Sequence, residues 1–279
     1  MLLFDAHNIG YSVYYSMPKL TSDDNNTSVI YGFLLRVKSI VEEFEDNECI
    51  FFFDSKKSFR KKEYPGYKDR RKDLTDEEKE SLQDAYRQFE LLRKEILPDM
   101  GFQCFRQIGL EADDLIAQFC NQYSYEKKII ISSDNDLWQL LDLETSQYSI
   151  MSRNIMTNES FWEEYNLSAW SWRLVKAWAG CQTDTVQGVK GIGPKTAIKY
   201  LNKELKKTTK KYSDIILNND VFDRNFPIVS LPHKKTKEIK YEKRKLKIKD
   251  FLKVFKKYEF YSFSNDAKNW MKLFCKKGK

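Results

Sequence analysis

The sequence predicts an α/β fold built on a parallel β-sheet. Three short apolar runs each end on an aspartate, over residues 1–5, 50–54 and 128–134. Short apolar runs bounded by polar residues are typical of strands buried on both faces, as in parallel sheets. A helical pattern between the first two runs gives the order of a βαβ unit. Because parallel α/β sheets carry their chemistry beyond the carboxyl ends of the strands, the three aspartates are expected to share one crevice.

The individual elements follow from the spacing of apolar residues along the chain. Strands are expected over residues 1–5, 49–53, 100–106 and 128–132, and helices over 28–45, 75–95, 112–123 and 136–142. The first helix is indicated by the helical spacing of Val29, Phe33, Val37, Ile40 and Phe44. Thr75-Asp-Glu-Glu78 is a capping-box pattern that predicts the start of the second helix.

The pattern of the chain changes near residue 155. Beyond this point tryptophans cluster at positions 162, 170, 172 and 178, and helical spacing replaces the strand pattern. We therefore expect a core over residues 1–155 and a helical subdomain over residues 156–279.

An uneven basic surplus suggests a polyanionic partner. The formal net charge is +7, and residues 234–249 carry nine Lys or Arg against two Glu. Such asymmetry favours nucleic-acid binding. The alternative is a solvated, lysine-rich surface with no partner.

The remaining composition excludes several classes of protein. Five single cysteines without a C-x-x-C pair argue against a disulfide framework and predict a reducing compartment. No apolar run approaches the roughly 18 residues that span a membrane, and no signal-peptide pattern is present, so a cytoplasmic protein is expected. With His7 and His233 as its two histidines, the chain lacks the material for histidine-based catalysis or His-rich zinc sites.

Carboxylates are therefore expected to do the chemistry. They lie at predicted strand ends or at a helix start: Asp5, Asp54, Glu111, Asp113, Asp114, Asp134 and Asp136. Crowded carboxylates raise one another's pKa, and divalent cations relieve the repulsion. Magnesium prefers such hard oxygen ligands, and two ions about 4 Å apart form the clamp used for phosphoryl displacement. The alternative is that each aspartate merely caps the next helix.

A second motif is the glycine-rich segment 188–197. Gly191-Ile-Gly193 predicts a tight hairpin, and Pro194 suits the first position of a helix. Backbone N–H groups at this helix start would hold a phosphate, with Lys190, Lys195 and Thr196 beside them. This helix-hairpin-helix pattern grips nucleic-acid backbone without reading bases. The alternative is an ordinary glycine-rich turn between helices.

A third motif combines basic and aromatic residues over 58–71, directly after Asp54. Arg60 and Arg70 alternate with Phe59, Tyr64 and Tyr67. Such a surface can stack bases and neutralise phosphates together. The alternative is an exposed loop that buries its aromatic side chains.

In this order the motifs resemble the 5′-nuclease superfamily of phage and bacterial 5′→3′ exonucleases and flap endonucleases. The resemblance covers most of the chain and is closest to the stand-alone phage enzymes. It rests on five segments: Asp5 within Phe-Asp-Ala-His-Asn, Asp54 before Tyr-Pro-Gly-Tyr-Lys-Asp-Arg-Arg, Glu111-Ala-Asp-Asp, Ser132-Ser-Asp-Asn-Asp, and Gly188-Val-Lys-Gly-Ile-Gly-Pro-Lys.

The resemblance implies a PIN-like nuclease core with a helical arch over residues 60–98 and a helix-hairpin-helix module over 178–201. It implies two Mg²⁺ or Mn²⁺ ions, the first held by Asp5, Asp54, Glu111 and Asp113, and the second by Asp114, Asp134, Asp136 and Asp184. Lys68 and Arg71 match arch positions that contact the scissile phosphate, Tyr67 is expected to stack on a base, and the hairpin would hold K⁺.

The implied activity is metal-dependent hydrolysis of DNA or RNA–DNA hybrid at 5′ ends, nicks and flaps, leaving 5′-phosphate products. The resemblance places it in DNA replication, as a monomer in the cytoplasm of a bacterial cell or a phage-infected host.

One position departs from the family pattern. Where the family has Gly-Asp-x-x-Asp-Asn, this chain reads Gly180-Cys-Gln-Thr-Asp184-Thr. Because a thiol is a soft, poor ligand for magnesium, the second ion is expected to bind more weakly. This departure motivates a rival function, a branched-DNA binding protein that no longer cuts. A further rival, a PIN-type ribonuclease, shares the core and does not need the hairpin.

Overall fold

A six-stranded sheet organises the molecule. The computed structural model describes residues 1–17, 21–22, 25–69 and 75–275. The strand order is β5-β4-β1-β6-β7-β8, parallel throughout except that β8 runs antiparallel to β7. The strands are β1 (Leu2–Asp5), β4 (Cys49–Phe52), β5 (Gln103–Phe105), β6 (Lys128–Ile131), β7 (Thr145–Ser149) and β8 (Asn154–Met156). The predicted α/β class and the four predicted strands are confirmed.

Alternate residues of the strands face two separate apolar layers, because successive strand side chains point to opposite faces. Phe4 and Phe51 face the layer formed by the helices α1 (Ala6–Ser16), α2 (Ser28–Phe44) and α4 (Asp76–Leu91). Leu3 and Ile50 face the opposite layer, formed chiefly by α6 (Ala112–Gln122). The sheet is thus covered on both faces, which explains the unbroken apolar runs.

The predicted helices form largely as expected. In α2 the apolar stripe is buried, and α4 begins with the predicted capping box of Thr75 and Glu78. A π-helical turn over Leu92–Ile96 and the short α5 (Leu97–Asp99) follow α4. The predicted helix at 136–142 is instead a 3₁₀ helix over Asn135–Leu140. The remaining short elements of this half are α3 (Phe59–Glu63), β2 (Thr21–Ser22) and β3 (Asn25–Asn26).

The helix α1 and the sheet strands β7 and β8 are among the elements that were not predicted. The strand β7 reads Thr-Ser-Gln-Tyr-Ser and lacks an apolar run, yet Gln147 is buried and its amide donates to the backbone oxygens of Ser132 (2.9 Å) and Asp134 (2.8 Å). Hydrogen bonding of buried polar groups thus replaces apolar contact in this strand.

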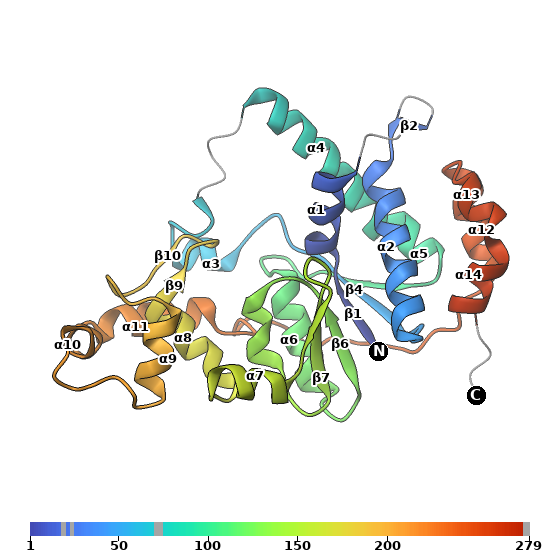
Figure 1. The fold of residues 1–279 in the computed structure, drawn as a ribbon. Coiled ribbons are helices and arrows are strands. Elements are labelled where there is room, and N and C mark those ends of the chain that lie inside the picture. The colour runs from blue at the N-terminus through green and yellow to red at the C-terminus, as the bar shows by residue number, and fades with distance from the viewer. Residues whose placement is uncertain (18–20, 23–24, 70–74, 276–279) are drawn as a thin grey trace.

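The second half of the chain is mainly helical and lies on two sides of the sheet (Figure 1). On one side are α7 (Asn158–Tyr165), a 3₁₀ turn (Ala169–Ser171), α8 (Trp172–Ala179), α9 (Pro194–Leu201), α10 (Lys210–Leu217) and α11 (Asn219–Val229). On the other, α12 (Ile248–Lys257), α13 (Tyr261–Asn265) and α14 (Ala267–Phe274) return to the core beside α2. The boundary near residue 155 stays a prediction.

Strands do not vanish beyond residue 155, contrary to expectation. Two strands of two residues each, β9 (Gly180–Cys181) and β10 (Val186–Gln187), pair antiparallel in a short hairpin. Gly180 has a φ of 75°, and a Cβ there would lie 2.4 Å from the carbonyl oxygen of Val186. The hairpin therefore requires glycine at this position. Within the described residues no helix is both long and apolar enough to cross a membrane.

Candidate metal centre

The predicted carboxylates gather at one edge of the sheet. Asp5 is the last residue of β1, and Asp54 and Asp134 follow the ends of β4 and β6. These strands are neighbours and run parallel, so their carboxyl ends share an edge. Asp113 is added by the first turn of α6, which Asp54 fixes by accepting the backbone N–H of Ala112 at 2.8 Å.

Burial and mutual repulsion disfavour the ionised form of these carboxyl groups when no cation is bound. Burial, then the charge of Asp54, raises the pKa of Asp5 to about 7, although hydrogen bonds from the Asn8 backbone and the Ser132 hydroxyl oppose the shift. Burial, then Asp136, raises the pKa of Asp134 to about 6. The pKa of Asp113 lies well above its ordinary value because of burial and the charges of Asp134, Asp5 and Asp54.

Lys68 and Tyr67 join Glu111 to Asp184 across the crevice. The ammonium of Lys68 lies 2.9 Å from Glu111 Oε2 and 3.6 Å from Asp184 Oδ1. Burial opposes its charge, but these carboxylates outweigh burial and raise the pKa of Lys68, so it stays cationic. The Tyr67 hydroxyl donates to Glu111 Oε2 (2.9 Å) and Asp184 Oδ2 (3.2 Å).

The Tyr67 ring is 3% exposed and packs against Ala177 and Val186. The structure therefore contradicts the predicted stacking of Tyr67 on a base. Its hydroxyl orients two carboxylates instead. The alternative weighed for segment 58–71, in which aromatic side chains are buried, holds for this residue.

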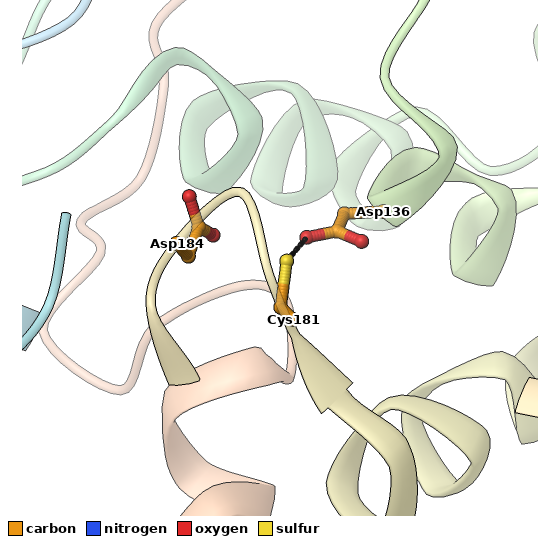
Figure 2. A group of neighbouring side chains, drawn as sticks. All are labelled: Asp136, Cys181 and Asp184. Atoms are coloured by element: carbon orange, nitrogen blue, oxygen red, sulfur yellow. Dashed lines mark hydrogen bonds between the residues drawn. The ribbon is translucent and has the colours of Figure 1, made fainter. Parts of the chain in front are cut away.

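A second group of ligand atoms lies beside the first. Asp136, Cys181 and Asp184 each offer one atom, and these atoms all lie within 4.8 Å of one another (Figure 2). The Cys181 thiol donates to Asp136 Oδ2 at 3.6 Å, as the dashed line in Figure 2 shows, and lies 3.0 Å from the Thr183 hydroxyl oxygen. Asp136 also forms an ion pair with Lys176 of α8, which the sequence analysis missed. The available signal was a single lysine in a helix whose side chains Trp172, Val175 and Trp178 are buried, because such a lysine needs an acidic partner.

Asp114 does not join either group, which corrects its predicted role as a metal ligand. Its side chain is fully buried and receives two hydrogen bonds from Arg60, at 2.6 and 2.7 Å. Asp114 also accepts the backbone N–H groups of Glu111 (3.2 Å) and His233 (2.8 Å). Arg60, 3% exposed, donates further to the carbonyl oxygen of Ile228 at 2.7 Å. Arg60 is therefore not available to DNA as predicted, and the pair joins α3 to α6 and to the end of α11.

A cavity of about 510 Å³ opens from the acidic edge toward α1 and α4. Its walls combine Asp54, Lys68 and Glu111 with aromatic side chains of His7, Tyr11, Tyr86 and Phe89. The Tyr11 and Tyr86 hydroxyl groups lie 2.9 Å apart. The sequence analysis missed these walls, although His7 and Tyr11 have the i, i+4 spacing that places side chains on one helix face.

The predicted DNA-binding residues occupy different environments. Lys190, Gly191 and Gly193 are exposed on the hairpin before α9, and within α9 Lys195 is exposed and Thr196 is half-buried. Pro194 is the first residue of α9, as predicted. Tyr64 is half-buried and is covered by Arg224, whose guanidinium lies 5.5 Å from its ring centre. Arg70 and Arg71 fall outside the described residues.

The chemistry of the donors fits divalent cations. Carboxylate oxygens dominate both groups, and magnesium, which keeps several waters, does not require every ligand to touch it. Lysine ammonium groups already lie against these carboxylates: Lys68 on Glu111, and Lys176 on Asp136. The crevice therefore attracts positive charge even within the chain itself. The division of the ligands between two ions stays a prediction.

The metal-free protein is expected to lose stability as the pH rises from about 4 to about 7. Asp5 and Asp134, with folded pKa values of about 7 and about 6, keep protons that the unfolded chain, with a pKa of about 3.9, has released. Over this interval the folded state binds more protons, so these groups lower the free energy of unfolding as pH increases. The measurement is thermal unfolding in a chelator across this range.

Added Mg²⁺ should raise the midpoint more at pH 8 than at pH 5, because it binds ionised carboxylates. Asp5→Asn should flatten the pH dependence in the chelator. A midpoint that rises with pH in the chelator, to the same extent in wild type and Asp5→Asn, would contradict the assignment.

A parallel α/β sheet with carboxylates gathered beyond its strand ends is the arrangement of a divalent-metal site on an α/β fold. Comparisons with known proteins define the family. Residues 1–166 match the model of the 5′-3′ exonuclease N-terminal resolvase-like domain. The chain therefore belongs to the 5′-3′ exonuclease family of the 5′-nuclease superfamily, which confirms the predicted resemblance.

Relatives of two lengths match. A 5′-3′ exonuclease of Aquifex aeolicus is 30% identical over 81% of this chain and 75% of its own length. DNA polymerase I of Caldicellulosiruptor bescii is 32% identical over 72% of this chain, which spans about a quarter (24%) of that relative. The structure of bacteriophage T5 D15 flap endonuclease with DNA and metal ions has a TM-score of 0.71 at 20% identity, covering 95% of this chain and 97% of that one. This likeness confirms the PIN-like fold.

Proposed function

We propose that this chain is a metal-dependent 5′-nuclease that hydrolyses phosphodiesters of DNA near 5′ ends and flaps. The observation that carries the proposal is the convergence of Asp5, Asp54, Asp113 and Asp134 at the carboxyl edge of three neighbouring strands. Their mutual repulsion needs cations, and their hard oxygens suit Mg²⁺ or Mn²⁺. When bound, such ions supply Lewis acidity to the phosphoryl group and lower the pKa of a water.

The chain's own residues position the substrate and balance its charge. Lys68 lies between Glu111 and Asp184 and opens on the cavity, so its ammonium can pair with the scissile phosphate as negative charge develops there. Tyr67 holds the two carboxylates in place through its hydroxyl. The half-buried aromatic side chains of Tyr11 and Tyr86 would take the nucleotide beside that phosphate.

Water attack in line with the leaving oxygen breaks the bond between phosphorus and the 3′ oxygen. The products are a 5′-phosphate and a 3′-hydroxyl. Analysing the ends of the cleaved strands tests this proposal: products carrying 3′-phosphate or 5′-hydroxyl ends would overturn it.

The hairpin before α9 would hold the duplex through its backbone. Gly193 and Gly191 are exposed, and a Cβ at either would meet no other atom within 4 Å, so a phosphate can approach closely. The predicted K⁺ would be held by backbone carbonyl oxygens of the same hairpin. We further propose that the protein accepts RNA–DNA hybrids as substrates and acts as a monomer.

Removing Lys190 and Lys195 together should weaken DNA binding in a salt-dependent way. Each lysine that pairs with a phosphate adds close to one unit to the slope of log affinity against log salt. Lys190→Ala/Lys195→Ala should therefore reduce that slope by about 2. Fluorescence anisotropy of a nicked duplex over a salt series measures it.

Lys127→Ala is the matched control, because Lys127 is exposed at the opposite, amino end of β6. An unchanged slope in the double variant would remove the hairpin from the binding surface.

Cys181 favours the second candidate, a protein that binds branched DNA without cutting it. A thiol where the family has a carboxylate removes one hard ligand from the second group. Tight binding of a flap substrate without cleavage in Mg²⁺ or Mn²⁺ would establish this function. A PIN-type ribonuclease would differ again, since replacing Gly191 and Gly193 should then leave RNA cleavage intact.

A further inference from the structure

The second group of ligand atoms has a mixed chemistry that the other carboxylates lack. Its atoms are one sulfur and two carboxylate oxygens, all within 4.8 Å of one another (Figure 2). Thiolate ligands favour zinc-like cations, whereas magnesium takes oxygen. We propose that Asp136, Cys181 and Asp184 bind a thiophilic divalent cation of the Zn²⁺ class in preference to Mg²⁺.

The local backbone holds the sulfur in place. Cys181 pairs with Val186 across the β9–β10 hairpin. At Gly180 the two strands lie so close that no side chain fits between them. Asn225, fully buried, donates to the carbonyl oxygens of Gln187 (2.9 Å) and Ala177 (3.0 Å) and so ties the hairpin to α8. Because the sulfur is already held in position, binding a metal costs less conformational freedom than it would for a mobile thiol.

Two lysines independently indicate that cations are attracted here. The Lys176 ammonium pairs with Asp136, and the Lys68 ammonium lies 3.6 Å from Asp184 Oδ1. Positive charge therefore lies against both carboxylates that flank the sulfur. A divalent cation would compete with these ammonium groups for the same oxygens.

The number of ligands leaves room for a further one. Zinc sites with three protein ligands and an open fourth position are those that bind water or substrate, whereas structural zinc sites are closed by four. Cys181 and Lys176 line a cavity of about 710 Å³ that extends to Gly191 and Gly193, so the sulfur side of the site borders on open space. This inference rests on the proposed function where it places the site beside the scissile phosphate, but metal binding can be measured without cleavage.

The alternative is that the thiol serves only as a hydrogen-bond donor to Asp136. Cys181 Sγ lies 3.6 Å from Asp136 Oδ2, so the proton could take the place of an ion. In a metal complex the sulfur must give up that proton and bind as thiolate. A sulfur-to-metal charge-transfer absorption distinguishes these states, because it requires a direct bond.

The experiment is a titration of the whole, metal-free protein with Cd²⁺, followed by ultraviolet absorption. The wild type should develop a charge-transfer band that saturates at one equivalent and survives excess Mg²⁺. Cys181→Ser should lack the band. Cys181→Asp should lack it too, weaken Cd²⁺ binding at least about tenfold, and raise both Mg²⁺ affinity and the cleavage rate at low Mg²⁺, because it replaces a soft ligand with a hard one.

Cys104→Ser is the matched control and should keep the band, because the charged groups that influence Cys104 are Arg93 and Arg244 rather than carboxylates. No band in the wild type, or the same band in Cys181→Ser, would overturn the inference. Failure of the proposed function gives a different result. A band that depends on Cys181, with no DNA cleavage in any cation, would support the metal site and contradict the nuclease activity. Mg²⁺-dependent cleavage without a band would support the nuclease activity and contradict the metal site.

Discussion

Asp113→Ala is expected to lower kcat on a 5′-ended DNA by roughly 10³-fold or more. Asp113 is influenced by the charges of Asp134, Asp5 and Asp54 and thus lies within the carboxylate cluster of the crevice. Losing a ligand there removes several kcal/mol of transition-state stabilisation, and each ~1.4 kcal/mol corresponds to tenfold in rate. Single-turnover cleavage of a labelled duplex measures the effect.

DNA affinity should be retained or should rise in the same variant, because a negative charge has been removed near the phosphates. Asp99→Ala, at an exposed aspartate of α5, is the matched control and should leave both quantities unchanged. Cleavage by Asp113→Ala at the wild-type rate would exclude Asp113 from the metal centre. If the variant lost both DNA binding and cleavage, it would be misfolded.

Arg60→Ala is expected to destabilise the fold by about 3–5 kcal/mol, because it leaves the Asp114 carboxylate buried without its partner. The guanidinium makes both short hydrogen bonds to Asp114 and also holds the carbonyl oxygen of Ile228. Arg60→Ala therefore unties α3 from α6 and from the end of α11. Denaturant unfolding, compared with the neighbouring Lys61→Ala at an exposed side chain, measures the loss.

The double variant Arg60→Met/Asp114→Leu should recover part of this stability, since an apolar pair leaves no buried charge. Recovery should be incomplete, because the backbone N–H groups of Glu111 and His233 lose their acceptor. Recovery would show that the loss in Arg60→Ala comes from the uncompensated charge of Asp114. Retained Mg²⁺ binding in the double variant would show that Asp114 is not a metal ligand. Unchanged stability in Arg60→Ala, with weakened DNA affinity, would instead restore the DNA contact that the sequence analysis predicted.

The contrast between Asp113 and Asp114 shows where sequence reasoning stops. Both lie in the first turn of α6, and consecutive helical residues point about 100° apart. Glu-Ala-Asp-Asp identifies the acidic segment, but Arg60 decides which side chain reaches the crevice. Arg60 lies 54 positions away in the sequence, so this partner depends on tertiary packing.

Apolar strands and amphipathic helices were predictable because burial imposes their period. The strand β7 was not, because its buried positions Thr145 and Gln147 are polar, and the hydrogen bonds that the Gln147 amide donates exist only in the folded sheet. The orientation of Tyr67 was hidden for the same reason, since its cover comes from Ala177 and Val186 of the second half. Cys181 was visible as a departure from the family pattern, but its distance to Asp136 required the structure.

Metal-dependent cleavage is the central claim, and a titration of Mg²⁺ and Mn²⁺ against cleavage of a 5′-labelled flap tests it most directly. We expect no cleavage in chelator and saturable cleavage in both metals, with Mn²⁺ effective at lower concentration, because Mn²⁺ binds mixed ligands better than Mg²⁺. Tight binding of the flap with no cleavage in either metal would contradict the account and leave a protein that holds branched DNA without cutting it.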